Sequence, residues 1–161
     1  KYILNFDLFI DDSGSMGCKT DLNGKRVELR TIARMVAFQM YASKLVKDTW
    51  IFACRGELFK IPPEEIFTAK IDGGTDISQC FRQSAKTGRP CLILTDGNDN
   101  LDDDLKYNPK AYVVAIDVRG LSKDFIPYAK NNQILFYNTR QGFQGSKIVG
   151  DSYNSVVPAN Y

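Results

Sequence analysis

The chain of 161 residues contains no histidine, and this absence excludes several kinds of active site. Catalysis by a Ser-His-Asp or Cys-His arrangement needs an imidazole as its base. Zinc and non-haem iron sites depend on the same side chain, commonly together with cysteine. The cysteines are scattered without a Cys-x-x-Cys pair, at Cys18, Cys54, Cys80 and Cys91. Oxygen ligands are the chemistry that remains, and we expect no catalytic residue.

Long apolar runs and glycosylation sequons are also missing. No apolar run approaches the roughly 20 residues of a membrane-spanning helix, so we expect no membrane span. The absence of an Asn-x-Ser/Thr sequon and the unpatterned cysteines favour an intracellular, cytoplasmic location. Because residue 1 already belongs to the first expected strand, we interpret the chain as a fragment of a larger protein. The net charge of +2 is too small to indicate nucleic-acid binding by itself.

Carboxylates and hydroxyls gather directly after the first apolar stretch. The run from Tyr2 to Ile10 predicts a strand that is buried on both faces. The residues that follow it are Asp11, Asp12, Ser13, Gly14 and Ser15. Asp11, Ser13 and Ser15 alternate, so a turn that folds back over the strand can point all three at one centre. Such ligands suit Mg²⁺ or Mn²⁺, but three alone would hold the ion weakly.

Two later stretches each offer one more oxygen ligand. Gly73-Gly74-Thr75-Asp76 opens an expected helix, and the apolar strand from Cys91 to Thr95 ends on Asp96-Gly97. The ordered set of Asp-x-Ser-x-Ser, Gly-Gly-Thr and a strand-terminal Asp-Gly resembles the metal-ion-dependent adhesion site (MIDAS) of von Willebrand factor A (vWA) domains. The alternative is that the hydroxyl residues only cap helices and turns, as Ser and Thr often do.

The vWA resemblance covers residues 1–138 and carries an expectation for each site residue. It implies that the metal ligands are Asp11, Ser13, Ser15, Thr75 and Asp96. In that family a carboxylate of a partner completes the coordination of the ion, so the resemblance implies a protein-binding module that recognises a Glu or Asp and catalyses no reaction. The Gly-Gly-Thr-Asp sequence resembles the intracellular branch of the family, including the A domain of Ro ribonucleoproteins.

Strands and helices alternate along the chain. Helices are predicted over 27–46, 77–86 and 122–130, and strands over 49–54, 57–61, 91–95, 112–116 and 133–137. Alternation of this kind predicts an α/β fold with a doubly wound, mostly parallel, Rossmann-like sheet. The short turn at Arg55-Gly56 makes 57–61 an antiparallel edge strand. In such sheets ligands bind at the carboxyl ends of the strands, where Asp11 and Asp96 would meet if their strands are neighbours.

Several stretches around this framework have weaker signals. Residues 139–161 have no helical period, although vWA domains usually close with a helix, so this extension is an extra strand, a partner segment or disordered. Residues 18–26 predict an exposed basic loop with a tight turn at Asn23-Gly24. We expect Asp12 to be exposed beside the site or to accept hydrogen bonds from its loop, and Asp76 to cap a helix. Residues 99–104 predict a solvated start of a short helix.

Two other functions stay open. An RNA- or ribonucleoprotein-associated vWA domain would use the basic loop with Arg30 or Arg34, although the aromatic residues of a stacking surface are absent there. A haloacid-dehalogenase-like phosphotransferase also places an Asp after its first strand, but it needs a second acid at the position of Ser13. The leading hypothesis is a binding module that depends on a divalent cation.

Overall fold

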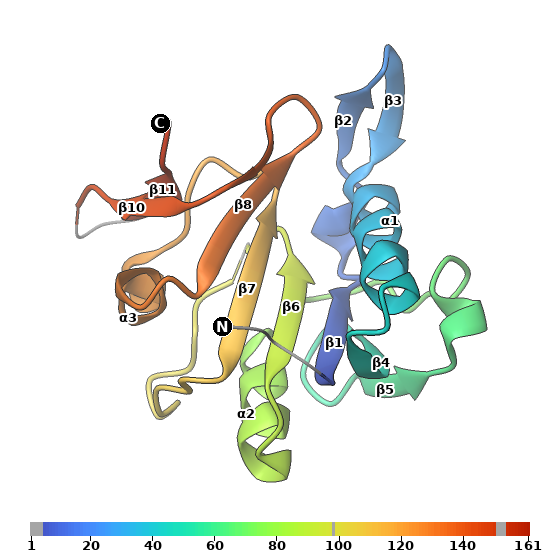
Figure 1. Cartoon of the computed structure of the whole chain (residues 1–161), viewed down its shortest axis with the longest axis horizontal. Coiled ribbons are helices and arrows are strands. Elements are labelled where there is room, and N and C mark those ends of the chain that lie inside the picture. The colour runs from blue at the N-terminus through green and yellow to red at the C-terminus, as the bar shows by residue number, and fades with distance from the viewer. Residues whose placement is uncertain (1–4, 98, 151–153) are drawn as a thin grey trace.

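The computed structural model describes residues 5–97, 99–150 and 154–161, arranged around one central sheet (Figure 1). The sheet has seven strands in the order β5-β4-β1-β6-β7-β8-β9. They are β1 (Phe6–Asp11), β4 (Val46–Phe52), β5 (Leu58–Ile61), β6 (Cys91–Thr95), β7 (Ala111–Ile116), β8 (Ile134–Asn138) and β9 (Gly142–Gln144). The inner strands are parallel, and β5 and β9 are antiparallel to their neighbours. The predicted doubly wound, mostly parallel α/β fold is therefore confirmed, with a second antiparallel strand at the opposite edge.

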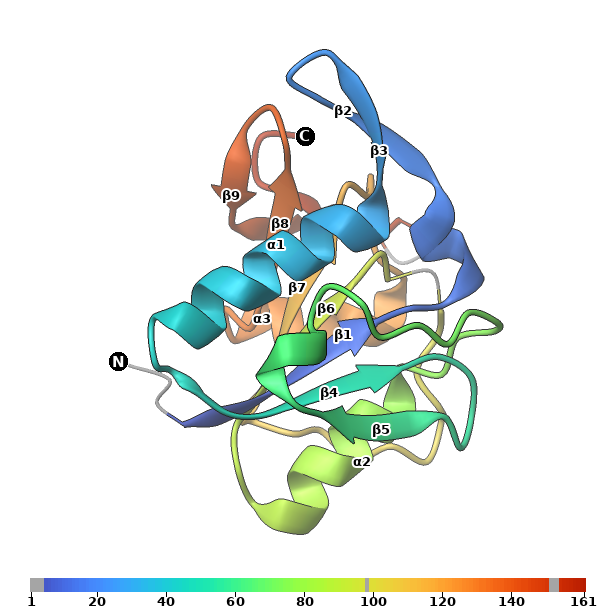
Figure 2. The ribbon, with the colours of Figure 1, turned by 90° about the vertical axis from the view of Figure 1, so that its right-hand side faces the viewer.

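Helices cover both faces of this sheet (Figure 2). The helix α1 (Leu29–Ala42) packs on one face, and α2 (Ser78–Thr87) and α3 (Ile126–Lys130) pack on the other. Side chains of β1 alternate between the two cores, so Leu8 contacts the α1 side and Phe9 the α2 side. Burial on both sides explains why this strand is almost continuously apolar. In the described part of the chain, no helix has the length and apolar character to cross a membrane.

The first helix and residues 18–26 differ from the sequence prediction. The first helix ends at Ala42 rather than near Val46, because Lys44 takes a left-handed conformation (φ 60°) and Val46 already begins β4. The predicted loop over 18–26 is instead a hairpin of β2 (Lys19–Leu22) and β3 (Lys25–Glu28) that projects beyond the start of α1 (Figure 1). Its turn residues Asn23 and Gly24 both have positive φ, as the tight turn requires.

Three short 3₁₀ turns connect the larger elements. They are η1 (Gly14–Gly17), η2 (Pro63–Glu65) and η3 (Lys123–Phe125). The short helix expected after Asp96 is absent from the described residues 99–107. Its acids are paired instead, since Asp102 accepts hydrogen bonds from Arg55 at 2.9 Å and from Arg82 at 2.8 Å.

Part of the extension over 139–161 belongs to the same fold. The strand β9 pairs with β8, so the extra-strand alternative is correct for this segment. Further on, β10 (Ser146–Ile148) and β11 (Val156–Pro158) form a separate antiparallel pair. Val156 is fully buried in the core on the α2 side, and its backbone exchanges two hydrogen bonds with Leu121, at 2.7 and 3.1 Å. The extension therefore contributes to both the sheet and the core.

Candidate metal centre

The candidate site lies at the carboxyl ends of β1 and β6, which are neighbouring parallel strands. From β1 the sheet continues to β4 on one side and to β6 on the other, so the order of the strands reverses here. Asp11 ends β1 and Asp96 directly follows β6. The expectation that their strands are adjacent is confirmed, and this is the edge at which α/β sheets bind ligands.

Asp11 is fully buried and both of its carboxylate oxygens accept hydrogen bonds. One oxygen accepts from the backbone N–H of Ser13 at 2.8 Å, which fixes the turn after the strand. The other accepts from the hydroxyl of Thr95 at 2.6 Å. Sequence reasoning missed Thr95, although its place at the end of the neighbouring strand was a usable signal. The hydroxyl of Thr95 in turn accepts from the Gly97 N–H at 2.9 Å and so orders the turn after Asp96.

The environment of Asp11 disfavours its negative charge. Burial raises the pKa of Asp11 from 3.8 to about 6, and the nearby charge of Asp96 adds to the increase, although hydrogen bonds from Thr95 and Ser13 act in the opposite direction. Asp96 is itself 8% exposed. Two carboxylates in a poorly hydrated place repel each other, and a cation between them would offset that repulsion.

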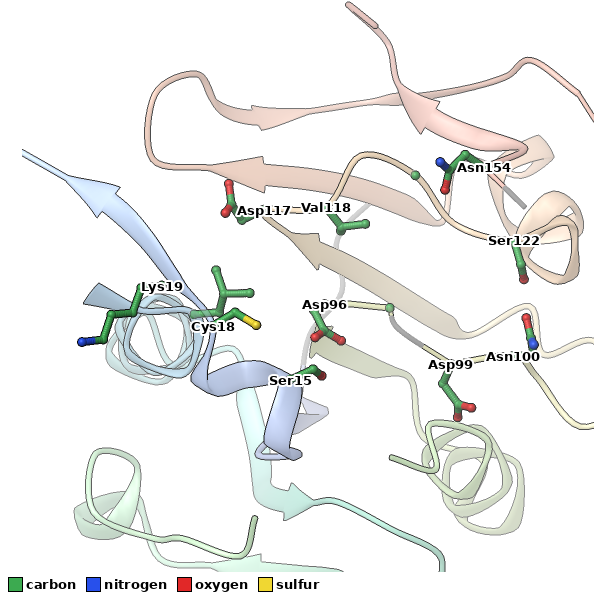
Figure 3. Close-up of a pocket in the computed structure, with 13 residues that line it drawn as sticks. Ser15, Cys18, Lys19, Asp96, Asp99, Asn100, Asp117, Val118, Ser122 and Asn154 are labelled. Carbon is green, nitrogen blue, oxygen red and sulfur yellow. The ribbon is translucent and has the colours of Figure 1, made fainter. Parts of the chain in front are cut away.

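The two predicted serines lie next to these acids. The hydroxyl oxygens of Ser13 and Ser15 are 3.3 Å apart, which is close enough for both to bind one ion. Figure 3 shows the side chains of Ser15 and Asp96 facing the same space. That space is a pocket of about 560 Å³, bounded by Ser15, Cys18, Lys19, Leu29, Asp96, Gly97, Asp99, Asn100, Asp117, Val118, Gly120, Ser122 and Asn154.

Thr75 reaches the same edge through a loop that is anchored on both sides of it. Before Thr75, the carbonyl of Gly73 accepts a hydrogen bond from the N–H of Gly14 at 2.7 Å. After it, the N–H of Asp76 donates to Ala53, just beyond the end of β4, at 2.7 Å. Gly73 has a φ of 107°, which a residue with a side chain rarely adopts. The half-buried Thr75 is thus held near the loop that carries both serines.

The two acids that neighbour the predicted ligands behave differently from the prediction. Asp12 is completely buried rather than exposed. It accepts hydrogen bonds from outside its own loop, from the side chain of Arg34 and the backbone N–H of Ile71. Asp76 does not cap α2 with its side chain but pairs with Arg55 at 3.4 Å. The N–H of Ile77, at the start of α2, donates to Asp99 at 3.1 Å instead. Both errors concern contacts between segments far apart in sequence.

The donor set is made of oxygen atoms only. Within the ranges that the structure describes, no group of three or more His, Cys, Asp or Glu side chains is placed to hold an ion. A metal at this edge would therefore depend on the hydroxyls of Ser13, Ser15 and Thr75 as well as on the two carboxylates. This composition fits a hard cation such as Mg²⁺ or Mn²⁺ and does not fit zinc.

Comparison with known proteins finds similar solved structures for this chain. No model of a protein family matches the chain, and no curated protein matches it. One similar solved structure is the conserved hypothetical protein BatB from Bacteroides thetaiotaomicron, with a TM-score of 0.49 and 12% identity, covering 70% of this chain and 66% of BatB. Another is an uncharacterized membrane spanning protein from Vibrio fischeri, with a TM-score of 0.43 and 17% identity over 85% of this chain and 91% of that one. Neither similarity bears on function.

Proposed function

We propose that this chain is a vWA-type binding module with a MIDAS, in which Asp11, Ser13, Ser15, Thr75 and Asp96 hold Mg²⁺ or Mn²⁺. One observation carries the proposal. Two nearly dehydrated carboxylates, Asp11 and Asp96, lie together with paired serine hydroxyls at the edge where the strand order reverses. A bound cation between the two carboxylates would turn their mutual repulsion into attraction.

An acidic side chain of a partner protein would complete the coordination of the ion. With at most two carboxylates of this chain on it, a divalent ion keeps enough positive character to attract one more anionic oxygen. The pocket beside Ser15 and Asp96 provides room for such a group to approach. The serine hydroxyls would be metal ligands, and the chain has no histidine to activate them, so the module would bind without catalysing a reaction.

The RNA alternative loses two of its candidate side chains. Arg30 and Arg34 both pair with Asp12, and their side chains are only 13% and 7% exposed. They are therefore not available to bind phosphate groups. Lys19 lines the pocket, and Lys25 and Arg26 are exposed further out on the projecting hairpin. These basic residues would speed association with an acidic partner.

Replacing Asp96 with Ala tests the proposed ligand set. We expect wild-type protein to melt at a higher temperature with Mg²⁺ or Mn²⁺ than with EDTA, because a cation that binds only the folded state stabilises it. Asp96→Ala should lose most of this increase, since one of two anionic ligands is gone. Asp104→Ala is the matched control, because the Asp104 side chain is 83% exposed and pairs with Arg82. An equal metal response in both variants would show that Asp96 is not a ligand.

Metal affinity should also depend on pH. Because the pKa of Asp11 is about 6 in the metal-free protein, protons compete with the ion below that pH. We expect the Mn²⁺ dissociation constant to be nearly constant above pH 7 and to rise about tenfold for each pH unit below about 5.5, as displacement of one proton requires. Calorimetric titration in buffers of different ionisation enthalpy would measure both the affinity and the proton release. A flat profile down to pH 5 would contradict the role of Asp11.

A further inference from the structure

The buried carboxylate of Asp12 bonds to both the helix α1 and the segment that precedes Thr75. Asp12 follows Asp11 and its side chain lies on the α1 side of the sheet, where it is fully buried. One of its oxygens, Oδ1, accepts from the guanidinium groups of Arg30 and of Arg34, the latter at 2.8 Å. Its other oxygen, Oδ2, accepts from the backbone N–H groups of Ile71 at 2.5 Å and Asp72 at 3.2 Å.

The segment bound by Oδ2 leads directly into the Gly-Gly-Thr stretch. Residues 67–75 form no helix or strand, so tertiary contacts decide where this segment lies. The arginines add to the contacts of Asp12, since Arg30 donates to the Asp72 carboxylate at 2.9 Å and Arg34 donates to the Phe67 carbonyl at 3.0 Å. Just beyond these contacts comes the bond between Gly14 N–H and the Gly73 carbonyl.

We propose that Asp12 is a positioning residue of the metal centre, which fixes the segment carrying Thr75 against the loop carrying Ser13 and Ser15. This proposal rests on the metal-binding function proposed above. Asp12 is not itself a ligand, because its two oxygens already accept four hydrogen bonds on the side of the sheet away from the Asp11 carboxylate. It acts through the placement of Thr75, as residues behind the ligands of a metal site commonly do.

The bridge needs both oxygens of a carboxylate. An asparagine at this position has one oxygen and one NH₂ group, so one of the two pairs of donors would face a donor. Either the arginines of α1 or the N–H groups of Ile71 and Asp72 would lose their acceptor. Asp12→Asn therefore removes the bridge that Asp12 makes between the segment and α1, at almost unchanged side-chain volume, and leaves the direct contacts of Arg30 with Asp72 and of Arg34 with Phe67.

The experiment compares Asp12→Asn with Asp7→Asn, a matched control in β1, the strand that precedes Asp12. Asp7 is also fully buried and also binds an arginine through both oxygens, but it lies at the opposite end of β1, on Arg89. Mn²⁺ affinity is measured at a temperature well below the melting point of each variant. We expect Asp12→Asn to weaken Mn²⁺ binding about tenfold or more, whereas Asp7→Asn leaves the affinity within about twofold of wild type.

A second measurement on the metal-free protein tests the placement itself. The N–H of Gly14 does not contact Asp12, so its hydrogen exchange reports whether the Gly73 segment stays in place. Exchange at Gly14 should become faster in Asp12→Asn and stay unchanged in Asp7→Asn. If Asp12→Asn does not fold, Arg34→Lys replaces it, because lysine lacks the planar fork with which Arg34 donates to Asp12 through one nitrogen and to the Phe67 carbonyl through the other.

The outcomes separate the two proposals. Wild-type protein that binds no Mn²⁺ would overturn the metal-binding function and with it the role of Asp12. Wild-type protein that binds Mn²⁺, together with an Asp12→Asn or Arg34→Lys variant of unchanged affinity and unchanged Gly14 exchange, would overturn the role of Asp12 alone.

Discussion

Replacing Asp11 with Asn is expected to remove the thermal stabilisation by Mg²⁺ or Mn²⁺ while leaving the metal-free protein at least as stable as wild type. For wild-type protein at a metal concentration of about 100 times the dissociation constant, mass action adds about 2.7 kcal/mol. For a domain of this size that corresponds to an increase in melting temperature of roughly 5–10 °C. The variant should show almost none of it, because it lacks the buried anionic ligand.

The expected stability of the metal-free Asp11→Asn variant follows from the raised pKa of Asp11 in the wild-type protein. A folded-state pKa of about 6 against 3.8 in the unfolded chain means that the folded state binds the proton more tightly. The contribution of Asp11 to stability is therefore most favourable below about pH 4 and is lost as the pH rises through 6. At pH 7.5 the charged carboxylate costs on the order of 3 kcal/mol, which an uncharged Asn avoids.

Thermal melts of both proteins at pH 7.5, with EDTA and with metal, measure the effect. Asp7→Asn is again the suitable control, because it removes another buried carboxylate of β1, one that binds Arg89 at the end of the strand away from the site. It should keep the metal response that Asp11→Asn loses. A metal response in Asp11→Asn equal to that of wild type would exclude the site.

Replacing Val156 with Asp should have the largest effect on folding itself. Val156 is fully buried in the core on the α2 side, so the variant loses about 1.5–3 kcal/mol of apolar burial and must also accommodate a charge without a partner. The sum approaches the whole stability of a typical domain. We expect a fall in melting temperature of more than about 10 °C, or no cooperative transition at all.

The matched control for this change is Val149→Asp, seven positions earlier in the same extension. Val149 is 50% exposed, and an exposed substitution typically changes the free energy of unfolding by about 0.5 kcal/mol or less. Circular dichroism melts of the two variants compare them directly. Similar stability in both would mean that residues 154–161 are not part of the folding unit.

The sequence predicted those elements whose signals are local. The strand Cys91–Thr95 was predicted with its correct bounds, because Pro90 precedes it and a turn follows Asp96. The end of the first helix was misplaced, since an apolar Val46 fits a helix face and a buried strand equally well. The hairpin over 19–28 was missed because its alternation is short, although its turn residues were identified.

In the candidate site, too, some features could be predicted from the sequence and others could not. The positions of Asp11 and Asp96 followed from strand alternation and the rule that ligands bind at carboxyl edges. The contacts of Asp12 with Arg30 and Arg34 could not be predicted in this way, because no local pattern brings the end of the first strand together with these positions of the helix. The sequence around Asp12 does not distinguish a buried aspartate bonded to arginines from an exposed one.

The two antiparallel edge strands have a consequence for self-association. A sheet that ends in a long, unpaired strand can be extended by another copy of the same chain, which leads to aggregation. Here β5 has four residues, includes the exposed Lys60 and is followed by two prolines, and β9 at the other edge has three residues. Short edge strands offer few backbone groups for continued pairing. The parallel strands are thus covered at both margins by antiparallel strands of the same chain, so a second copy would find only short edges to extend.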